Sequence, residues 1–443
     1  PDPLVLREGS HGMTAETPVL SAAPSEARSL IRSLWAVVGP WVGISLMGII
    51  GLILLFGVQG TDGHTELIFG SRGDSWTVPN WSVPVTLGGT VLALVALGLV
   101  AYGVWLKVHE KKLPSWLTLT YGIAVMAGFL LWIMAGNPNA LPFTVLLTGS
   151  LTLAVPLVYG AMAGLLCERV GIINIAIEGQ LLGGAFLAVV AASMTGNAYV
   201  GLLAAPIAGA LVGAVLVIFA VRYWVDQIIV GVVLNVLVIG LTNYLFSTVL
   251  SQDPQSYNSP PRLPVIEIPL LSGIPVLGPL LFRHSIIVYL MMVAVAVLQV
   301  LVFRSKWGLR LRAVGEHPKA ADTVGINVNR TRVLNTILGG AVAGLGGAAL
   351  VSAGLAFTKE MSSGKGYIAL AAMILGRWSP KGALAAALLF GFADSLRSVL
   401  GNLGSPVPSQ FLAMLPYLAT IFAVAGLVGR VRAPAAEGIP YKK

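Results

Sequence analysis

The sequence has 443 residues, of which 56% are hydrophobic and only 10% are charged, and its mean hydropathy is +0.86. Soluble domains carry about 25% charged residues, so this composition excludes a soluble globular protein and predicts an all-α polytopic membrane protein. The net charge of +9 does not point to nucleic acid, because the basic residues flank apolar runs, as in cytoplasmic loops that contact anionic membrane lipid. The single cysteine, Cys167, excludes an intrachain disulfide.

Apolar runs recur along the whole chain. A helix needs about 20 apolar residues to span a bilayer, so the runs predict about 10–12 transmembrane helices. They lie at 31–56, 84–106, 115–135, 143–166, 171–193, 200–221, 226–250, 285–303, 333–355, 381–400 and 409–429. A further run at 366–377 is short for a crossing, and we expect a half-helix or a re-entrant segment there.

One membrane domain between two short tails is expected. Residues 1–27 combine what looks like a tag remnant before Met13 with a polar cytoplasmic tail, 28–430 form the transmembrane domain, and 431–443 form a second cytoplasmic tail. Within the domain, residues 143–430 carry all the motifs described below. The helix pair at 84–135 is expected as an addition to that core.

Basic residues predict the orientation of the chain. Arg28 and Arg32 near the start and Arg430 and Arg432 near the end place both termini in the cytoplasm. The loops at 57–83 and 251–283 hold few basic residues and many Pro, Gly and Ser residues, so both are expected to face outward.

The segment 304–332 (RSKWGLRLRAVGEHPKAADTVGINVNRTR) is charged, partly helical and set between apolar runs. It carries more basic residues than membrane anchoring needs, and its paired arginines, its turn and its amphipathic stretch follow a definite order. We interpret it as a docking surface for a cytoplasmic partner; the alternative is a solvated basic loop. The candidate docking residues are Arg310, Arg312, Glu316, His317, Pro318, Lys319 and Asp322.

Two groups of polar residues fall inside apolar runs. In the first group, Asn174, Glu178 and Gln180 fall within two turns of one predicted helix. Asn174 and Glu178 are four residues apart and are predicted to share a face. The second group is Asn235 and Asn243. Intramembrane polar residues are costly and are often functional, so all five are candidates for lining a central pathway. The alternatives are that Glu178 braces a broken helix and that the asparagines join helices by hydrogen bonds.

Three basic residues, Lys359, Lys365 and Arg397, are expected on the outer side, against the usual charge bias. They are candidates for contact with acidic residues of an extracytoplasmic partner, since such rim charges tune encounter and orientation. The alternative is that they are neutral surface residues.

The sequence lacks the motifs of an enzyme. It holds no GxxxxGK[ST] phosphate loop, no HExxH, no CxxC and no GxSxG, and its five histidines lack metal-ligand spacing. ATP hydrolysis by a phosphate loop of this chain is therefore excluded, and we expect no catalytic residue, no metal and no cofactor.

Four motifs stand in order within 143–430. They are Asn174–Gln180, Arg312–Ala321 with Gly325–Val328, Gly339–Gly344, and Gly366–Ala372 with Gly376–Ala383. Together they resemble the permease subunits of bacterial ABC importers of the branched-chain amino acid, ribose and nucleoside group. Glu178-Gly179-Gln180 and Gly376-Arg377-Trp378-Ser379-Pro380 are most similar to nucleoside permeases, whereas ribose permeases carry a Gly-Ile-Asp-Leu-Ser-Val-Gly pattern at the first of these positions.

The resemblance implies a type II-like permease fold in the bacterial plasma membrane and import of nucleosides. It also implies three protein partners: a separate ATP-binding cassette subunit that binds ATP and Mg, a second homologous permease that forms a heterodimer with this chain, and an extracytoplasmic substrate-binding lipoprotein. A ribose-type sugar permease is the alternative within the group. A secondary carrier driven by an ion gradient is the alternative outside it, with Glu178 as its candidate proton-exchanging acid.

Overall fold

The computed structural model describes residues 23–111, 113–404, 407–408, 410–414, 417 and 433–442. In this part of the chain, ten helices are long and apolar enough to span a membrane, which confirms the predicted polytopic all-α fold. They are α1 (Ala23–Val58), α2 (Val85–Val108), α3 (Ser115–Ile133), α4 (Phe143–Glu168), α5 (Ile177–Thr195), α6 (Ala198–Val217), α7 (Gln227–Leu245), α9 (Ile286–Arg304), α12 (Val328–Val351) and α14 (Pro380–Asn402). The run predicted at 409–429 lies mostly outside the described residues.

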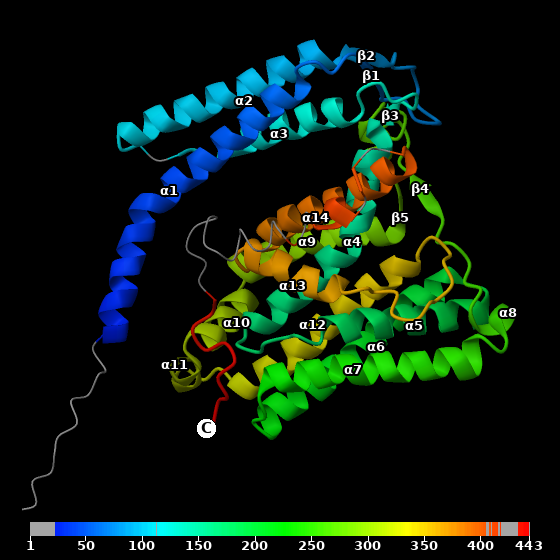
Figure 1. Cartoon of the computed structure of the whole chain (residues 1–443). Coiled ribbons are helices and arrows are strands. Elements are labelled where there is room, and N and C mark those ends of the chain that lie inside the picture. Colours follow the sequence, from blue (N-terminus) through cyan, green and yellow to red (C-terminus); the bar gives the residue numbers. More distant parts are fainter. Residues whose placement is uncertain are drawn as a thin grey trace, which may run out of the picture.

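Helix α4 is the centre of the main bundle. Of the residues in its membrane span, 89% are buried inside the protein, whereas only 22% are buried in the span of α2. Helices α5, α9, α12, α13 (Lys365–Leu375) and α14 pack against it, and they lie around it in Figure 1. Most of α4 is therefore shielded from lipid by its own neighbours.

Small residues bring α6 and α12 into backbone contact. Gly209 and Gly213 on α6 face Gly340 and Gly344 on α12, and each pair has the four-residue spacing that lets membrane helices approach closely. A Cβ atom added at Gly340 would meet the carbonyl oxygen of Gly209. The high glycine content of the chain thus has a direct use in packing.

Helix α13 is short, as the sequence predicted. It has 11 residues, about 16 Å at 1.5 Å per residue, so it crosses roughly half of a bilayer. The segment 169–176 before α5 is also not helical. The predicted shared helix face of Asn174 and Glu178 is therefore wrong, because α5 begins only at Ile177.

Helices α1, α2 and α3 form a separate layer (Figure 1). Its end packs on the main bundle, where Leu130 and Met134 of α3 share an apolar cluster with Leu146 of α4 and Leu396 of α14. The sequence predicted only the pair at 84–135 as an addition. The structure adds α1 to that pair, because the apolar residues of α1 pack against α2 and α3.

The two predicted outer loops lie on one side of the molecule, called here the loop side. The first loop forms a sheet in which β1 (His64–Ile68) pairs with β2 (Trp81–Pro84) and with β3 (Leu141–Pro142). The second loop contains the short helix α8 (Pro254–Tyr257) and pairs β4 (Val265–Glu267) with β5 (Arg283–Ser285). An ion pair of 3.2 Å between Arg283 and Asp74 joins the two loops.

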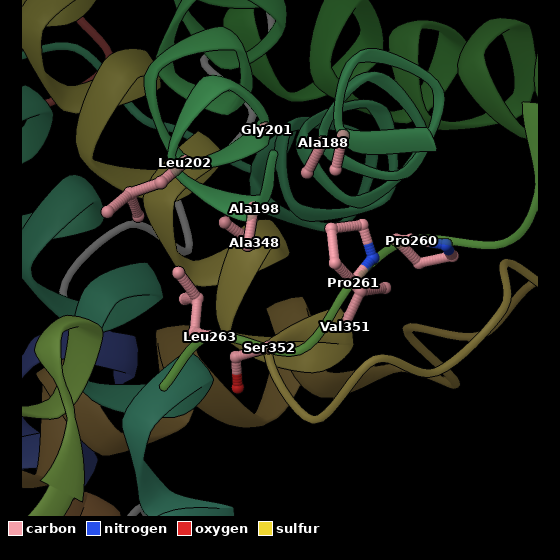
Figure 2. Close-up of a pocket in the computed structure, with 11 residues that line it drawn as sticks. Ala188, Ala198, Gly201, Leu202, Pro260, Pro261, Leu263, Ala348, Val351 and Ser352 are labelled. Carbon is pink, nitrogen blue, oxygen red and sulfur yellow. The ribbon is translucent and has the colours of Figure 1, made fainter. Parts of the chain in front are cut away.

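The second loop also packs directly on the bundle. Pro260, Pro261 and Leu263 lie against α5, α6 and α12 around a cavity of about 20 Å³, shown in Figure 2. A cavity of that size holds about one water molecule, so this contact seals the bundle and has no room for a solute.

Candidate functional site

The predicted docking segment forms two short helices, α10 (Lys306–Glu316) and α11 (Pro318–Thr323). Ser305 caps α10 by accepting a hydrogen bond from the Gly308 N–H at 3.0 Å, and Pro318 occupies the first turn of α11, where its missing N–H costs little. We call the side of the molecule with these helices the coupling side. The docking role of the segment stays a prediction.

The two helices have one buried and one exposed face. Leu311, Val314, Gly315 and Ala321 are buried against the bundle. The residues exposed on the other face include Leu309, Arg310, Glu316, His317, Lys319 and Val324. A partner that approached the coupling side would meet this exposed face first.

Arg312 is turned inward. Its guanidinium lies 5.4 Å from the ring centre of Phe303, and that of Arg169 lies 5.6 Å from the same ring. Burial lowers the pKa of Arg169, and the nearby Glu316 carboxylate opposes that shift. Arg312 therefore links the docking segment to the end of α4.

The last described residues, 433–442, form a strap across the coupling side, close to α11 in Figure 1. Backbone N–H groups of the strap donate to the Gly315 carbonyl at 2.9 Å, the Glu316 carboxylate at 3.3 Å and the Gly171 carbonyl at 3.2 Å. The buried Arg332 guanidinium donates to a strap carbonyl at 2.9 Å. The strap thus ties the docking segment to the turn that follows α4.

Two side chains of the strap make further contacts. The Lys442 ammonium lies 4.7 Å from a ring centre of Trp224, in the loop between α6 and α7. Glu437 lies beside the buried Glu168 carboxyl group, and burial raises the pKa of Glu437. Four separate stretches of the coupling side therefore meet on this strap.

The junction between α13 and α14 is fixed to the end of α4. The Trp378 indole N–H donates to the Glu168 carboxylate at 2.6 Å, and the Arg169 guanidinium donates twice to the Trp378 carbonyl, at 3.0 and 2.7 Å. Glu168 and Arg169 were not among the functional residues predicted from the sequence. Their only signal was their position, a charged pair at the end of an apolar run.

Asn174 and Gln180 satisfy each other inside the bundle. The Asn174 amide donates to the Gln180 carbonyl oxygen at 3.0 Å, and the Gln180 amide donates back at 3.3 Å. Both side chains are fully buried. This mutual pairing joins the turn before α5 to the first turn of that helix, and a role of either residue in lining a pathway stays a prediction.

Glu178 holds the start of α13. Its carboxylate accepts from the Ser362 hydroxyl at 2.6 Å, the Gly364 N–H at 2.8 Å and the Gly366 N–H at 2.6 Å. A carboxylate at a helix N-terminus binds otherwise unpartnered N–H groups and matches the helix dipole. These three hydrogen bonds let Glu178 brace the start of α13. A role of Glu178 in lining a pathway stays a prediction.

The two asparagines of α7 behave differently. Asn235 accepts from the Gly179 N–H at 2.8 Å and donates to the Ile175 carbonyl at 2.9 Å and the Tyr367 hydroxyl at 3.1 Å, so it joins three helices. Asn243 lies nearer the loop side and donates to Glu360 at 3.3 Å. The structure therefore places Asn243 apart from the network around Glu178.

A polar cavity of about 520 Å³ opens between α4, α13 and α14, and Ala413 and Tyr417 also line it. Lys365 and Arg397, two of the three predicted outer residues, line it together with Asp394. Lys359 lies elsewhere, with its ammonium 5.7 Å from the ring centre of Phe246. Asp394 was not predicted from the sequence, although an acidic residue inside the apolar run 381–400 is itself a sign of a functional site.

The structure combines a polytopic bundle, a short helix that crosses about half of a bilayer and a surface helix pair on one side. Residues 146–427 match the family described as the permease component of the branched-chain amino acid transport system, and the chain belongs to this family. It is a multi-pass membrane protein. No solved structure matches the chain.

Curated relatives are named ABC transporter permeases. The chain is 38% identical over 311 residues to the guanosine ABC transporter permease protein NupQ of Bacillus subtilis, covering 68% of this chain and 97% of NupQ. It is 36% identical over 309 residues to the nucleoside ABC transporter permease protein NupC of Lactococcus lactis, with the same two shares. A second Bacillus subtilis protein, the guanosine ABC transporter permease protein NupP, is 27% identical over 336 residues, 70% of this chain and 94% of NupP.

Proposed function

We propose that this chain is the membrane permease of an ATP-driven importer of nucleosides. A separate subunit would bind ATP and Mg and would hydrolyse the ATP. The observation that carries the proposal is the likeness to guanosine and nucleoside permeases over nearly their whole length. Both resembling motifs make structural contacts. Glu178 of NIAIEGQ accepts a hydrogen bond at the start of α13, and Trp378 of GRWSP donates one at the α13–α14 junction.

Three protein partners follow from this function. An ATP-binding cassette subunit would dock on the exposed face of α10 and α11. A second, different permease would complete the pathway, in keeping with the two guanosine permeases named in Bacillus subtilis. A substrate-binding lipoprotein would dock on the loop side, where exposed Lys359 is a proposed contact. Lys365 and Arg397, the other two predicted contacts, line the cavity between α13 and α14.

The orientation follows from the same assignment. The coupling side, with the strap, would face the cytoplasm of a bacterium, and the loop side would face outward. Both chain ends would then be cytoplasmic, and the membrane would be the plasma membrane.

The contacts of α10 and α11 suggest how docking reaches the pathway. A displacement of α10 would act on Arg169 through Phe303 and Arg312, and on the Gly171 turn through the strap. Arg169 in turn holds the Trp378 carbonyl at the end of α13. Transport needs such an element with two positions and needs no reactive group in this chain.

Reversing charges on the exposed face of the docking segment should weaken the ATPase complex. The double variant Arg310→Glu with Lys319→Glu is expected to reduce the ATPase subunit that co-purifies in mild detergent by roughly tenfold, because it reverses two charges at the contact. Arg310 and Lys319 are exposed, so the fold should be little affected.

Arg222→Glu is the matched control, because Arg222 is also exposed and basic on the coupling side but lies outside the segment. Equal losses in the two proteins would mean a general charge effect at the membrane surface. Full co-purification of the double variant would contradict the docking assignment.

A further inference from the structure

The polar cavity reaches deep into the membrane-spanning part. Helix α14 runs from Pro380 on the coupling side to Asn402 on the loop side. At 1.5 Å per residue, Asp394 lies about 12 Å below the loop-side end of α14. Lys365 is the first residue of α13. The start of α13 is held by Glu178, which is the second residue of α5. The cavity therefore extends from the loop side toward the middle of the bundle.

Polar side chains follow one face of α14 into this cavity. Asp394, Arg397, Ser398 and Asn402 are spaced i, i+3, i+4 and i+8, and all four line it. The neighbouring face, with Ser395, Leu396, Val399 and Leu400, is buried in the bundle. Helix packing accordingly leaves the polar face unexplained.

Charges within a membrane span are costly and mark substrate paths. Here three charged groups line one cavity, and both cations act on the charge of Asp394. Asn174 and Gln180, by contrast, are paired with each other and fully buried, so they offer a solute neither free groups nor space.

We propose that this cavity binds the ribose of the substrate, with the Asp394 carboxylate accepting hydrogen bonds from the vicinal 2′- and 3′-hydroxyls. This inference rests on the proposed nucleoside function. An ionised carboxylate has only acceptors, and its two oxygens match two neighbouring hydroxyl donors. A volume of about 520 Å³ lies within the range of small-molecule sites.

The other lining residues suit the rest of a nucleoside. Lys365 and Arg397 carry hydrogen-bond donors for acceptor atoms of the solute, and their positive charges lie near the carboxylate of Asp394. The exposed ring of Tyr417 lines the same cavity and offers a flat apolar surface to a base. Selectivity for ribose over 2′-deoxyribose would then arise at Asp394.

The test is uptake into proteoliposomes holding the complete importer, with binding protein loaded to saturation with guanosine or 2′-deoxyguanosine. The unmodified protein should transport guanosine faster per loaded binding protein. Asp394→Asn, of nearly equal size, should slow guanosine about 10- to 100-fold, the value of a charge-assisted hydrogen bond, and should slow 2′-deoxyguanosine much less.

Glu267→Gln, at an exposed acid of the loop side, is the control and should change neither rate. ATP hydrolysis stimulated by loaded binding protein should persist in Asp394→Asn, which separates solute binding from docking. An unchanged ratio of the two rates in Asp394→Asn would overturn this inference while leaving the nucleoside function intact. No nucleoside uptake by the unmodified importer would instead remove the proposed function itself.

Discussion

Glu178→Ala is expected to lose most of its folded yield in detergent, because three donors converge on the missing carboxylate. Removing one partner of a buried charged network costs about 3–5 kcal/mol, a large part of the stability of a domain. The N-terminus of α13 would then hold uncompensated N–H groups in the middle of the bundle. Thermal unfolding followed by size-exclusion chromatography measures the loss.

Glu267→Ala is the control for this experiment, since Glu267 is exposed on β4 and should be neutral. A Glu178→Ala protein of normal stability that fails to transport would contradict the brace and favour the pathway interpretation. Normal stability with normal transport would remove Glu178 from the functional residues.

Gly340→Ala is expected to disrupt the contact between α6 and α12. The added methyl group would meet the Gly209 carbonyl oxygen and the backbone of Gly213, so the two helices must separate. Overpacking of a tight interface costs about 1–3 kcal/mol, and in a membrane the lost backbone contact is not replaced by water. The thermal midpoint in detergent should fall by several degrees.

Gly240→Ala in α7 gives the matched control, because a Cβ atom there meets no atom within 4 Å. It carries the same chemical change and the same gain in helix propensity. If both variants unfold at the same temperature, the close approach of α6 and α12 does not contribute to stability as argued.

The sequence was sufficient for features that depend on local chain chemistry. Run lengths predicted the spanning helices and the short α13, because bilayer thickness sets the required number of residues. The order of Pro, Gly and charged residues in 304–332 predicted a partly helical segment with a turn and an amphipathic stretch, which forms α10 and α11. Their boundaries follow from a serine cap and a proline in the first turn.

Features that depend on distant contacts were not predictable from one sequence. Helical spacing predicted that Asn174 and Glu178 share one face, but α5 begins only at Ile177. Glu178 instead contacts Gly364, and Asn174 pairs with Gln180. The strap and the Asp394 cavity join segments far apart in the chain. Charge bias also grouped Lys359 with Lys365 and Arg397, although its neighbour is Phe246.

The most direct test of the account is nucleoside uptake by purified components in proteoliposomes. Vesicles that contain this chain, the second permease and the ATPase subunit should accumulate guanosine only when ATP and the loaded binding protein are both supplied. Omitting the ATPase subunit should abolish uptake, since this chain has no phosphate loop. Guanosine uptake by this chain alone, driven by a proton or sodium gradient without ATP, would contradict the account.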